Sequence, residues 1–292
     1  MRGVEPQLQS VWDMRAAANF IGGGTGTGLL LWAAMSASAH GTSLLGPVLL
    51  ALFCVGVGLV CVWAEIGRPL RALNVFLHPK TSWMTREGLI AMPLFALGLT
   101  AAWLGSIALA WLAALTGLGF LYCQARIVSA SKGIPAWRED SIVPLLVTTG
   151  LAEGAGLFAI LALFLANAPG VLFALPLLLL IIARLLLWRR YRTRLERPNG
   201  APRRALQEIS AAHPLFVIVG HALPAALAVL ALFLPAFAPI LLALAGTAVL
   251  GMGWRFKAAL ITRFAYTQGF ALERVPARTP GHSRPGVKPG WG

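Results

Sequence analysis

Four ionisable side chains fall within or at the edges of long apolar stretches of this chain: Glu65, Glu87, Glu153 and His221. Ionisable residues are costly inside a membrane, and those that occur there usually have a function. Glu65 and Glu87 flank one polar segment, which is expected to bring both carboxylates to the same membrane interface. Two acids at that level could hydrogen-bond the polar head of a ligand and exchange protons with it.

Two arginines and a tryptophan accompany these acids. Arg68 follows Glu65, Arg86 precedes Glu87, and Trp83 is typical of an anchor at the membrane–water interface. One interpretation is a headgroup pocket in which the cations lie beside the acids. The other is an interfacial salt-bridge network that only fixes the loop, and the sequence leaves both open.

Glu153 lies near the middle of an apolar stretch, among threonines and glycines. Burial without a partner disfavours the charged form of a carboxylate. We therefore expect another helix to supply a partner, and Arg184 and His221 are the candidates. A proton relay through Glu153 and His221 and a buried structural hydrogen bond are both compatible with this position.

Apolar stretches separated by basic segments predict an all-α integral membrane protein with eight transmembrane helices in a bundle. No Lys or Arg lies between Arg15 and Arg68, Arg86 and Arg126, Arg138 and Arg184, or Arg204 and Arg255. Each gap is long enough for two spans, since one span needs about 20 apolar residues. The expected spans are 17–38, 46–64, 88–104, 107–126, 142–166, 169–188, 212–234 and 237–254.

The basic residues set the expected orientation of the chain. Cationic loops stay on the cytoplasmic side, so both termini and all substantial loops are predicted on the cytoplasmic face of a bacterial inner membrane. The chain then divides into a cytoplasmic segment 1–16, a membrane domain 17–260 and a basic cytoplasmic tail 261–292. The end of this tail, rich in Pro, Gly and basic residues, is expected to be extended until a partner binds it.

Composition excludes several classes of protein. The chain has 292 residues, of which 58% are hydrophobic and 12% charged, and a mean hydropathy of +0.76. The net charge of +14 is therefore a topology signal, and its expected counterparts are the lipid bilayer and an acidic docking surface, not nucleic acid. Cys54, Cys61 and Cys123 form no C-x-x-C pair, so no metal or iron–sulfur site is predicted. His213 and His221, eight apart on one helix, do not predict a haem.

A glycine-rich run at residues 22–28 opens the first expected span. It superficially resembles a phosphate-binding loop, but no strand precedes it and it lies in a membrane segment. Small residues that let helix backbones approach closely are the better explanation.

Residues 65–87 carry a recognisable pattern. Glu65-Ile-Gly-Arg-Pro-Leu-Arg-Ala-Leu-Asn and Thr81-Ser-Trp-Met-Thr-Arg-Glu87 resemble the loop after the second helix in DmsC/NrfD-type membrane anchors of complex iron–sulfur molybdoenzymes. The family's usual form begins with His where this chain has Glu65. The resemblance implies an eight-helix anchor in which Glu87 matches the acidic quinone-site residue and Glu65 takes the position of the histidine. Arg68, Trp83 and Arg86 would border the same site.

Two shorter stretches narrow the resemblance. Trp12-Asp-Met-Arg-Ala-Ala-Ala-Asn-Phe-Ile-Gly-Gly-Gly and Phe264-Ala-Tyr-Thr-Gln-Gly-Phe-Ala-Leu look like the branch that contains the membrane subunit of phenylacetyl-CoA:acceptor oxidoreductase. Asp13 and Asn19, in the first stretch, are expected neighbours of the quinone. The resemblance implies that the cofactor here is a quinone. Molybdopterin and iron–sulfur clusters would belong to two partners, a catalytic subunit and a four-cluster ferredoxin-like subunit.

The residues and the resemblance together predict a membrane anchor of anaerobic respiration that passes electrons between a docked iron–sulfur subunit and the quinone pool. Because the basic face is the docking face, the docked subunits are expected in the cytoplasm. A sulfite- or DMSO-type oxidoreductase anchor is the alternative within the family. The alternative from another class is a small secondary transporter with Glu153 as its coupling site near the midplane.

Overall fold

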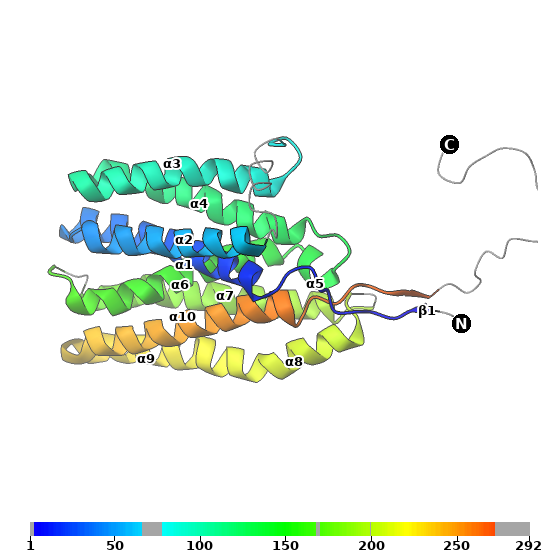
Figure 1. The fold of residues 1–292 in the computed structure, drawn as a ribbon. Coiled ribbons are helices and arrows are strands. Elements are labelled where there is room, and N and C mark those ends of the chain that lie inside the picture. The colour runs from blue at the N-terminus through cyan, green and yellow to red at the C-terminus, as the bar shows by residue number, and fades with distance from the viewer. Residues whose placement is uncertain (1–2, 66–77, 168–169, 199, 272–292) are drawn as a thin grey trace, which may run out of the picture.

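The computed structural model describes residues 3–65, 78–167, 170–198 and 200–271. Over these residues the chain forms a bundle of long helices that run side by side (Figure 1). The helices are α1 (Met14–His40), α2 (Leu45–Glu65), α3 (Trp83–Leu104), α4 (Ile107–Ser129), α5 (Pro135–Arg138), α6 (Ile142–Leu161), α7 (Ala174–Leu195), α8 (Arg203–Val217), α9 (Leu223–Phe233) and α10 (Ala238–Thr262). Strands β1 (Gly3–Val4) and β2 (Phe270–Ala271) pair antiparallel.

Seven helical segments in the described part of the chain are long and apolar enough to cross a membrane. They are Leu45–Glu65, Trp83–Leu104, Ile107–Ser129, Ile142–Phe164, Val171–Leu195, Arg203–Phe233 and Pro235–Thr262. The all-α multi-pass membrane class is thereby confirmed, with seven candidate spans in place of the expected eight. The first expected span is the helix α1, which has 27 residues but is not among the seven. It packs among the other helices, so a high apolar content is not required of it.

Helix α1 lies within the bundle because its small residues allow close approach of neighbouring backbones. Seventeen of its residues are buried, from Ala16 to Ala37. A Cβ built at Gly22 would meet the backbone of Cys54 in α2, and one built at Gly28 would meet the backbone of Gly150 in α6. The interpretation of the 22–28 run as packing glycines is therefore confirmed.

We expect Gly154→Val to lower the free energy of unfolding by about 1–3 kcal/mol, because overpacking at a closed helix contact forces the backbones apart. Gly154 faces the backbone of Gly28 and Leu29 with no room for a side chain. The measurement is the unfolding midpoint of the detergent-solubilised protein. Gly251→Val is the matched control, since no atom lies within 4 Å of a Cβ built there; an equal loss in both variants would contradict the close α1–α6 contact.

Polar caps define several helix ends. Asp13 caps α1 by accepting a hydrogen bond from the Arg15 N–H at 2.7 Å. Gly105, with φ 61°, ends α3, and Ser106 then caps α4 by accepting from the Leu109 N–H. This Gly–Ser pair needs the left-handed region at its first residue, which glycine adopts readily, and it forms a two-residue return between α3 and α4.

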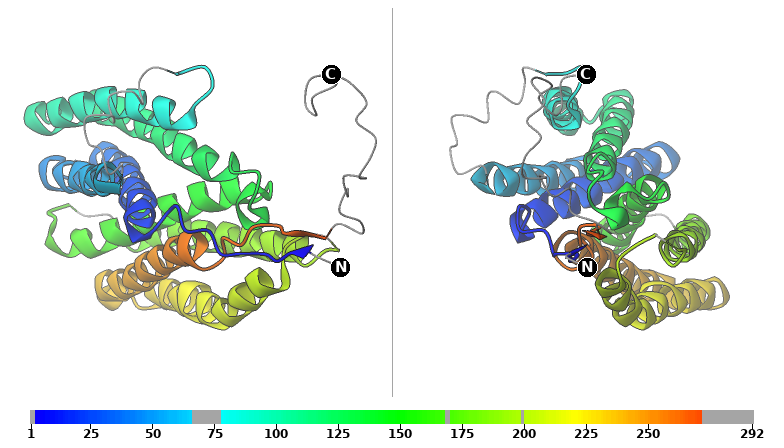
Figure 2. Two further views of the ribbon diagram at one scale, coloured as in Figure 1. Left: turned by 45° about the vertical axis from the view of Figure 1, so that its right-hand side comes forward. Right: turned by 90° about the vertical axis from the view of Figure 1, so that its right-hand side faces the viewer.

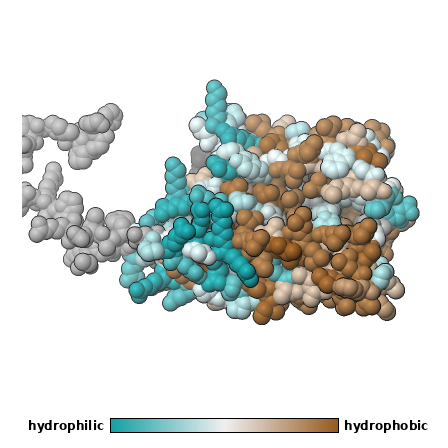
Figure 3. All heavy atoms as spheres, turned by 180° about the vertical axis from the view of Figure 1, so that it is seen from behind, coloured by the Kyte–Doolittle hydropathy of each residue, from teal (hydrophilic) through white to brown (hydrophobic). Residues whose placement is uncertain are grey.

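The two described ends of the chain leave the bundle together (Figure 2). Gln9 N–H donates to the Ala265 carbonyl at 2.9 Å and Thr267 N–H to the Gln7 carbonyl at 2.8 Å, which extends the β1–β2 pairing down to the bundle. Hydrophilic side chains gather at this end, whereas apolar side chains cover much of the length of the helices (Figure 3). We call it the polar end. The last part of the predicted tail, 272–292, lies outside the described residues.

Candidate functional site

A pocket of about 400 Å³ opens where the beginnings of α1 and α3 meet the end of α2. Pockets for small organic ligands have volumes of roughly 300–1,000 Å³. The wall is mostly apolar, and its lining includes Trp12, Asn19, Phe20, Glu65, Met84 and Glu87. Three of the residues predicted for a headgroup site, Asn19, Glu65 and Glu87, thus line a single pocket.

Glu87 lies on the inner face of α3, within the first two turns. The helix starts at Trp83, earlier than the expected residue 88, because the Ser82 side chain accepts a hydrogen bond from the Thr85 N–H at 3.2 Å and caps it. Glu87 is therefore part of the buried stripe of α3, with only 6% of its surface exposed. A carboxylate at this depth needs hydrogen-bond donors.

Two amide side chains supply those donors. Asn19 Nδ2 in α1 and Gln124 Nε2 in α4 both donate to Glu87 Oε1, at 3.1 and 3.0 Å. Gln124 Nε2 also donates to the Asn19 carbonyl at 3.0 Å, so the contact joins three helices. Glu87 Oε2 makes no hydrogen bond to a residue that the structure describes. Because Glu87 lines the pocket, this oxygen is the candidate group for binding a ligand there.

We expect Gln124→Leu to destabilise the protein by about 1.5–3 kcal/mol, the usual range for a hydrogen bond to a charged group. The reason is that Glu87 keeps only the Asn19 donor and remains buried. Unfolding of the solubilised protein in denaturant, followed by circular dichroism, gives the value. Tyr122→Phe on the exposed side of the same helix is the control, and equal stability of the two variants would show that Gln124 does not support Glu87.

Glu65 and Asp13 lie at the rim of the pocket. The half-buried Glu65 ends α2, and its Oε1 accepts a long hydrogen bond from the Asp13 N–H at 3.4 Å. The Asp13 carboxylate itself pairs with Arg15 at 2.9 Å. Hydrogen bonds from Arg15 hold the pKa of Asp13 below its ordinary value, so Asp13 is an ionised helix cap beside the pocket.

Trp83 and Arg86 do not line the pocket: Trp83 packs against Tyr122 of α4, and Arg86 is directed to the loop before α3. Arg86 donates to the carbonyls of Pro79 and Lys80 at 2.9 and 2.8 Å, and its guanidinium lies 4.2 Å from the Trp83 ring centroid. Arg126 approaches the same ring at 4.9 Å. These contacts fix the 78–82 turn against α3 and α4. Arg68 and most of the motif that begins at Glu65 lie outside the described residues.

No family model matches this chain. A search of curated proteins finds no match either. The resemblance of residues 65–87 to the DmsC/NrfD-type anchors is carried by the motif residues alone.

A second polar cluster lies deeper in the bundle, around Glu153 in α6. Its partner is Lys257 in α10, whose Nζ donates to Glu153 Oε2 at 2.6 Å and to the Phe20 carbonyl at 2.9 Å. Thr25 Oγ1 donates to the same carboxylate oxygen at 3.0 Å. Both side chains are 2% exposed or less. The expected partners, Arg184 and His221, do not hydrogen-bond Glu153. Helix α10 continues to Thr262, past the expected end of the last span at residue 254, and Lys257 is a buried residue of this extension.

Arg184 and His221 form a separate buried pair. Arg184 Nε donates to His221 Nε2 at 3.2 Å, and His221 Nδ1 lies 2.8 Å from the Phe216 carbonyl. The imidazole therefore carries its proton on Nδ1 and is neutral. Arg184 also donates to the Gly220 carbonyl. That carbonyl lacks the usual helical donor because Pro224, four residues on, has no N–H, and residues 218–222 form a π-helical turn there.

The described contacts do not join Glu153 to His221 directly. Glu153 hydrogen-bonds Lys257 and Thr25, whereas His221 hydrogen-bonds Arg184, which stays protonated in proteins. Sequence reasoning missed Lys257 and Gln124. Gln124 could have been found as an amide inside an otherwise apolar span, and Lys257 as a cation following an apolar helix without a break.

Proposed function

We propose that this multi-pass membrane protein is the quinone-reactive anchor subunit of a molybdenum or tungsten iron–sulfur oxidoreductase. The observation that carries the proposal is the pocket lined by the buried carboxylate of Glu87, one oxygen of which accepts no hydrogen bond from the described residues, beside an apolar wall. A quinone ring is flat and apolar with carbonyl oxygens at its edge. A pocket with aromatic walls and one polar side suits it.

In this proposal some residues of the pocket bind the quinone and one, Glu87, exchanges protons with it. A bound quinone would supply the two-electron, two-proton chemistry, with the electrons arriving from a partner's iron–sulfur cluster. Glu87 Oε2 would donate a proton to a quinone oxygen on reduction or accept one from a quinol hydroxyl on oxidation. Asn19 and Gln124 keep the carboxylate in position, and Trp12 and Phe20 contribute aromatic surface.

The polar end would be the docking face for a four-cluster ferredoxin-like subunit, which in turn would hold a molybdopterin catalytic subunit. Residues 189–204 carry seven arginines against one acid, Glu196, and the paired chain ends project from the same end. The distribution of basic residues favours the cytoplasmic side of a bacterial inner membrane for this face. The short motifs favour the phenylacetyl-CoA:acceptor type over the sulfite or DMSO types.

A secondary transporter is the second candidate, favoured by the Glu153–Lys257 pair within the bundle and the π-helical turn beside Arg184. Interrupted helices and buried charges mark the binding sites of many transporters. In this reading Glu153 would be the coupling carboxylate.

Purification of the full-length tagged protein from its own membranes separates the two candidates. The anchor should co-purify with two larger subunits that contain iron in excess over molybdenum or tungsten. Isolation of this chain alone, together with substrate uptake in reconstituted vesicles, would instead support the transporter.

A further inference from the structure

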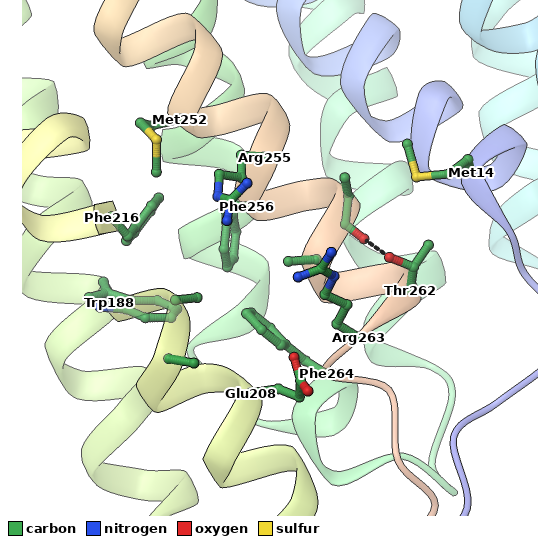
Figure 4. Close-up of a pocket in the computed structure, with 14 residues that line it drawn as sticks. Met14, Trp188, Glu208, Phe216, Met252, Arg255, Phe256, Thr262, Arg263 and Phe264 are labelled. Atoms are coloured by element: carbon green, nitrogen blue, oxygen red, sulfur yellow. Dashed lines mark hydrogen bonds between the residues drawn. The ribbon is translucent and has the colours of Figure 1, made fainter. Parts of the chain in front are cut away.

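We propose a second binding site on this protein, for the phosphodiester headgroup of a glycerophospholipid, in a pocket between α8 and α10 at the polar end (Figure 4). This pocket has a volume of about 220 Å³ and shares no lining residue with the pocket among α1, α2 and α3. Its ligand and its role are independent of the quinone proposal.

The inner wall of this pocket consists of aromatic rings that pack against one another. Trp188, Phe216, Phe256 and Phe264 line it, and each is 3% exposed or less. The ring centroids of Trp188 and Phe216 are 4.8 Å apart, and those of Trp188 and Phe256 are 5.7 Å apart, both in edge-to-face arrangements. Such a wall offers an apolar surface to the glycerol and the first methylenes of a lipid chain.

The mouth of the pocket is cationic. Arg255 lies in α10 and Arg263 directly follows the end of that helix. Both are exposed, and neither forms an ion pair with a residue that the structure describes. Glu208 is the single acid of the lining. Two cations and one acid leave one positive charge, which one phosphodiester neutralises. Guanidinium groups bind phosphate oxygens in pairs of charge-assisted hydrogen bonds.

The position along the helix matches the headgroup layer. Trp254, 42% exposed, precedes Arg255, and exposed tryptophans concentrate at the membrane–water interface. From 238 to 254 α10 carries no charged residue, and Arg255, Lys257 and Arg263 follow. Basic pockets between membrane helices at this level are typical sites for lipid headgroups.

Native mass spectrometry of the detergent-solubilised full-length protein tests the site. Dioleoyl phosphatidylglycerol is added in one arm, a diacyl glycolipid without phosphate in the second, and inorganic phosphate in the third. We expect one phosphatidylglycerol to bind, and Arg255→Gln with Arg263→Gln to weaken that binding about tenfold or more, since charge-assisted hydrogen bonds to phosphate are lost. Arg189→Gln with Arg190→Gln, a neighbouring exposed pair, should leave it unchanged.

A second variant tests the cavity with both arginines in place. Ala211 is exposed and lines the pocket, so Ala211→Trp should fill the space and also prevent binding. Equal binding of phosphatidylglycerol by the wild type and the Arg255/Arg263 variant would overturn the proposal. So would equal binding of the phosphate-free glycolipid, or inorganic phosphate binding as well as the lipid, which would indicate a site for a free anion.

Discussion

Glu87→Gln is expected to lower quinone reduction by the assembled complex by about 10²–10⁴-fold, the usual contribution of a positioned general acid or base. The amide keeps an oxygen that can accept from Asn19 and Gln124, so the packing around Oε1 survives. What it loses is the exchangeable proton at the position of Oε2. The measurement is quinone-dependent turnover beside turnover with an artificial dye, which takes its electrons from the partner subunits.

Two comparisons make this experiment decisive. Glu196→Gln is the control, because it removes an exposed acid that pairs with Arg192 and is not part of the pocket around Glu87. It should leave both the quinone-dependent and the dye-dependent activity intact. Dye turnover and subunit assembly should remain normal in Glu87→Gln. Loss of assembly would assign Glu87 a structural role, and normal quinone turnover would place the proton donor elsewhere.

The second large effect is expected at the buried ion pair. Lys257→Met should destabilise the protein by about 3–5 kcal/mol, because it leaves the Glu153 carboxylate buried without its cation. Thermal unfolding of the solubilised protein gives the loss. The variant that also carries Glu153→Gln removes the uncompensated charge, and it should recover most of the stability.

The outcome of that pair of variants also bears on function. If Lys257→Met is as stable as the wild type, Glu153 is protonated or hydrated in the bundle, and the ion pair does not hold α6 to α10. If the double variant is stable and retains quinone turnover, the pair is structural. Loss of turnover in a stable double variant would instead assign the pair to proton transfer.

Helix α1 connects the two polar clusters. Asn19 contacts Glu87 on one side of the helix, and the Phe20 carbonyl and Thr25 contact the Lys257–Glu153 pair on another. Its glycines bring the neighbouring helices close enough for these contacts. A Cβ built at Gly253 would come within 2.6 Å of the Glu153 Cγ, so the room for the ion pair also depends on a glycine in α10.

The sequence correctly predicted the class of fold and the position of Glu65 and Glu87 at the same end of the bundle, because both depend on local patterns. Apolar stretches of sufficient length place the helices. The polar segment between Glu65 and Glu87 joins two consecutive spans, which requires those residues to lie at the same end. Asn19 was also placed correctly beside them, from the resemblance of its surroundings to a known family.

The remaining features depend on how the helices are rotated against each other, which no local pattern specifies. Lys257 falls beyond the last expected span, 237–254, because the first basic residue after an apolar stretch is taken as its end. It lies in the bundle because a carboxylate of α6 compensates its charge. Arg184 is buried for a related reason: a proline in the neighbouring helix frees the carbonyl of Gly220 to accept from it.

The same limit applies to Arg86, which was expected beside the acids. Its sequence neighbours do not reveal that two loop carbonyls, of Pro79 and Lys80, lie within reach and satisfy its guanidinium. The start of α3 at Trp83 follows from the cap by Ser82, a signal that hydropathy does not detect.

Photolabelling of the purified complex with a light-activated quinone analogue tests the central claim most directly. We expect the label on peptides of α1, α2 and α3 that line the pocket, those containing Trp12 and Met84 in particular, and its loss when unlabelled quinone is present in excess. Specific labelling of a partner subunit or of helices outside this pocket would contradict a quinone site built around Glu87.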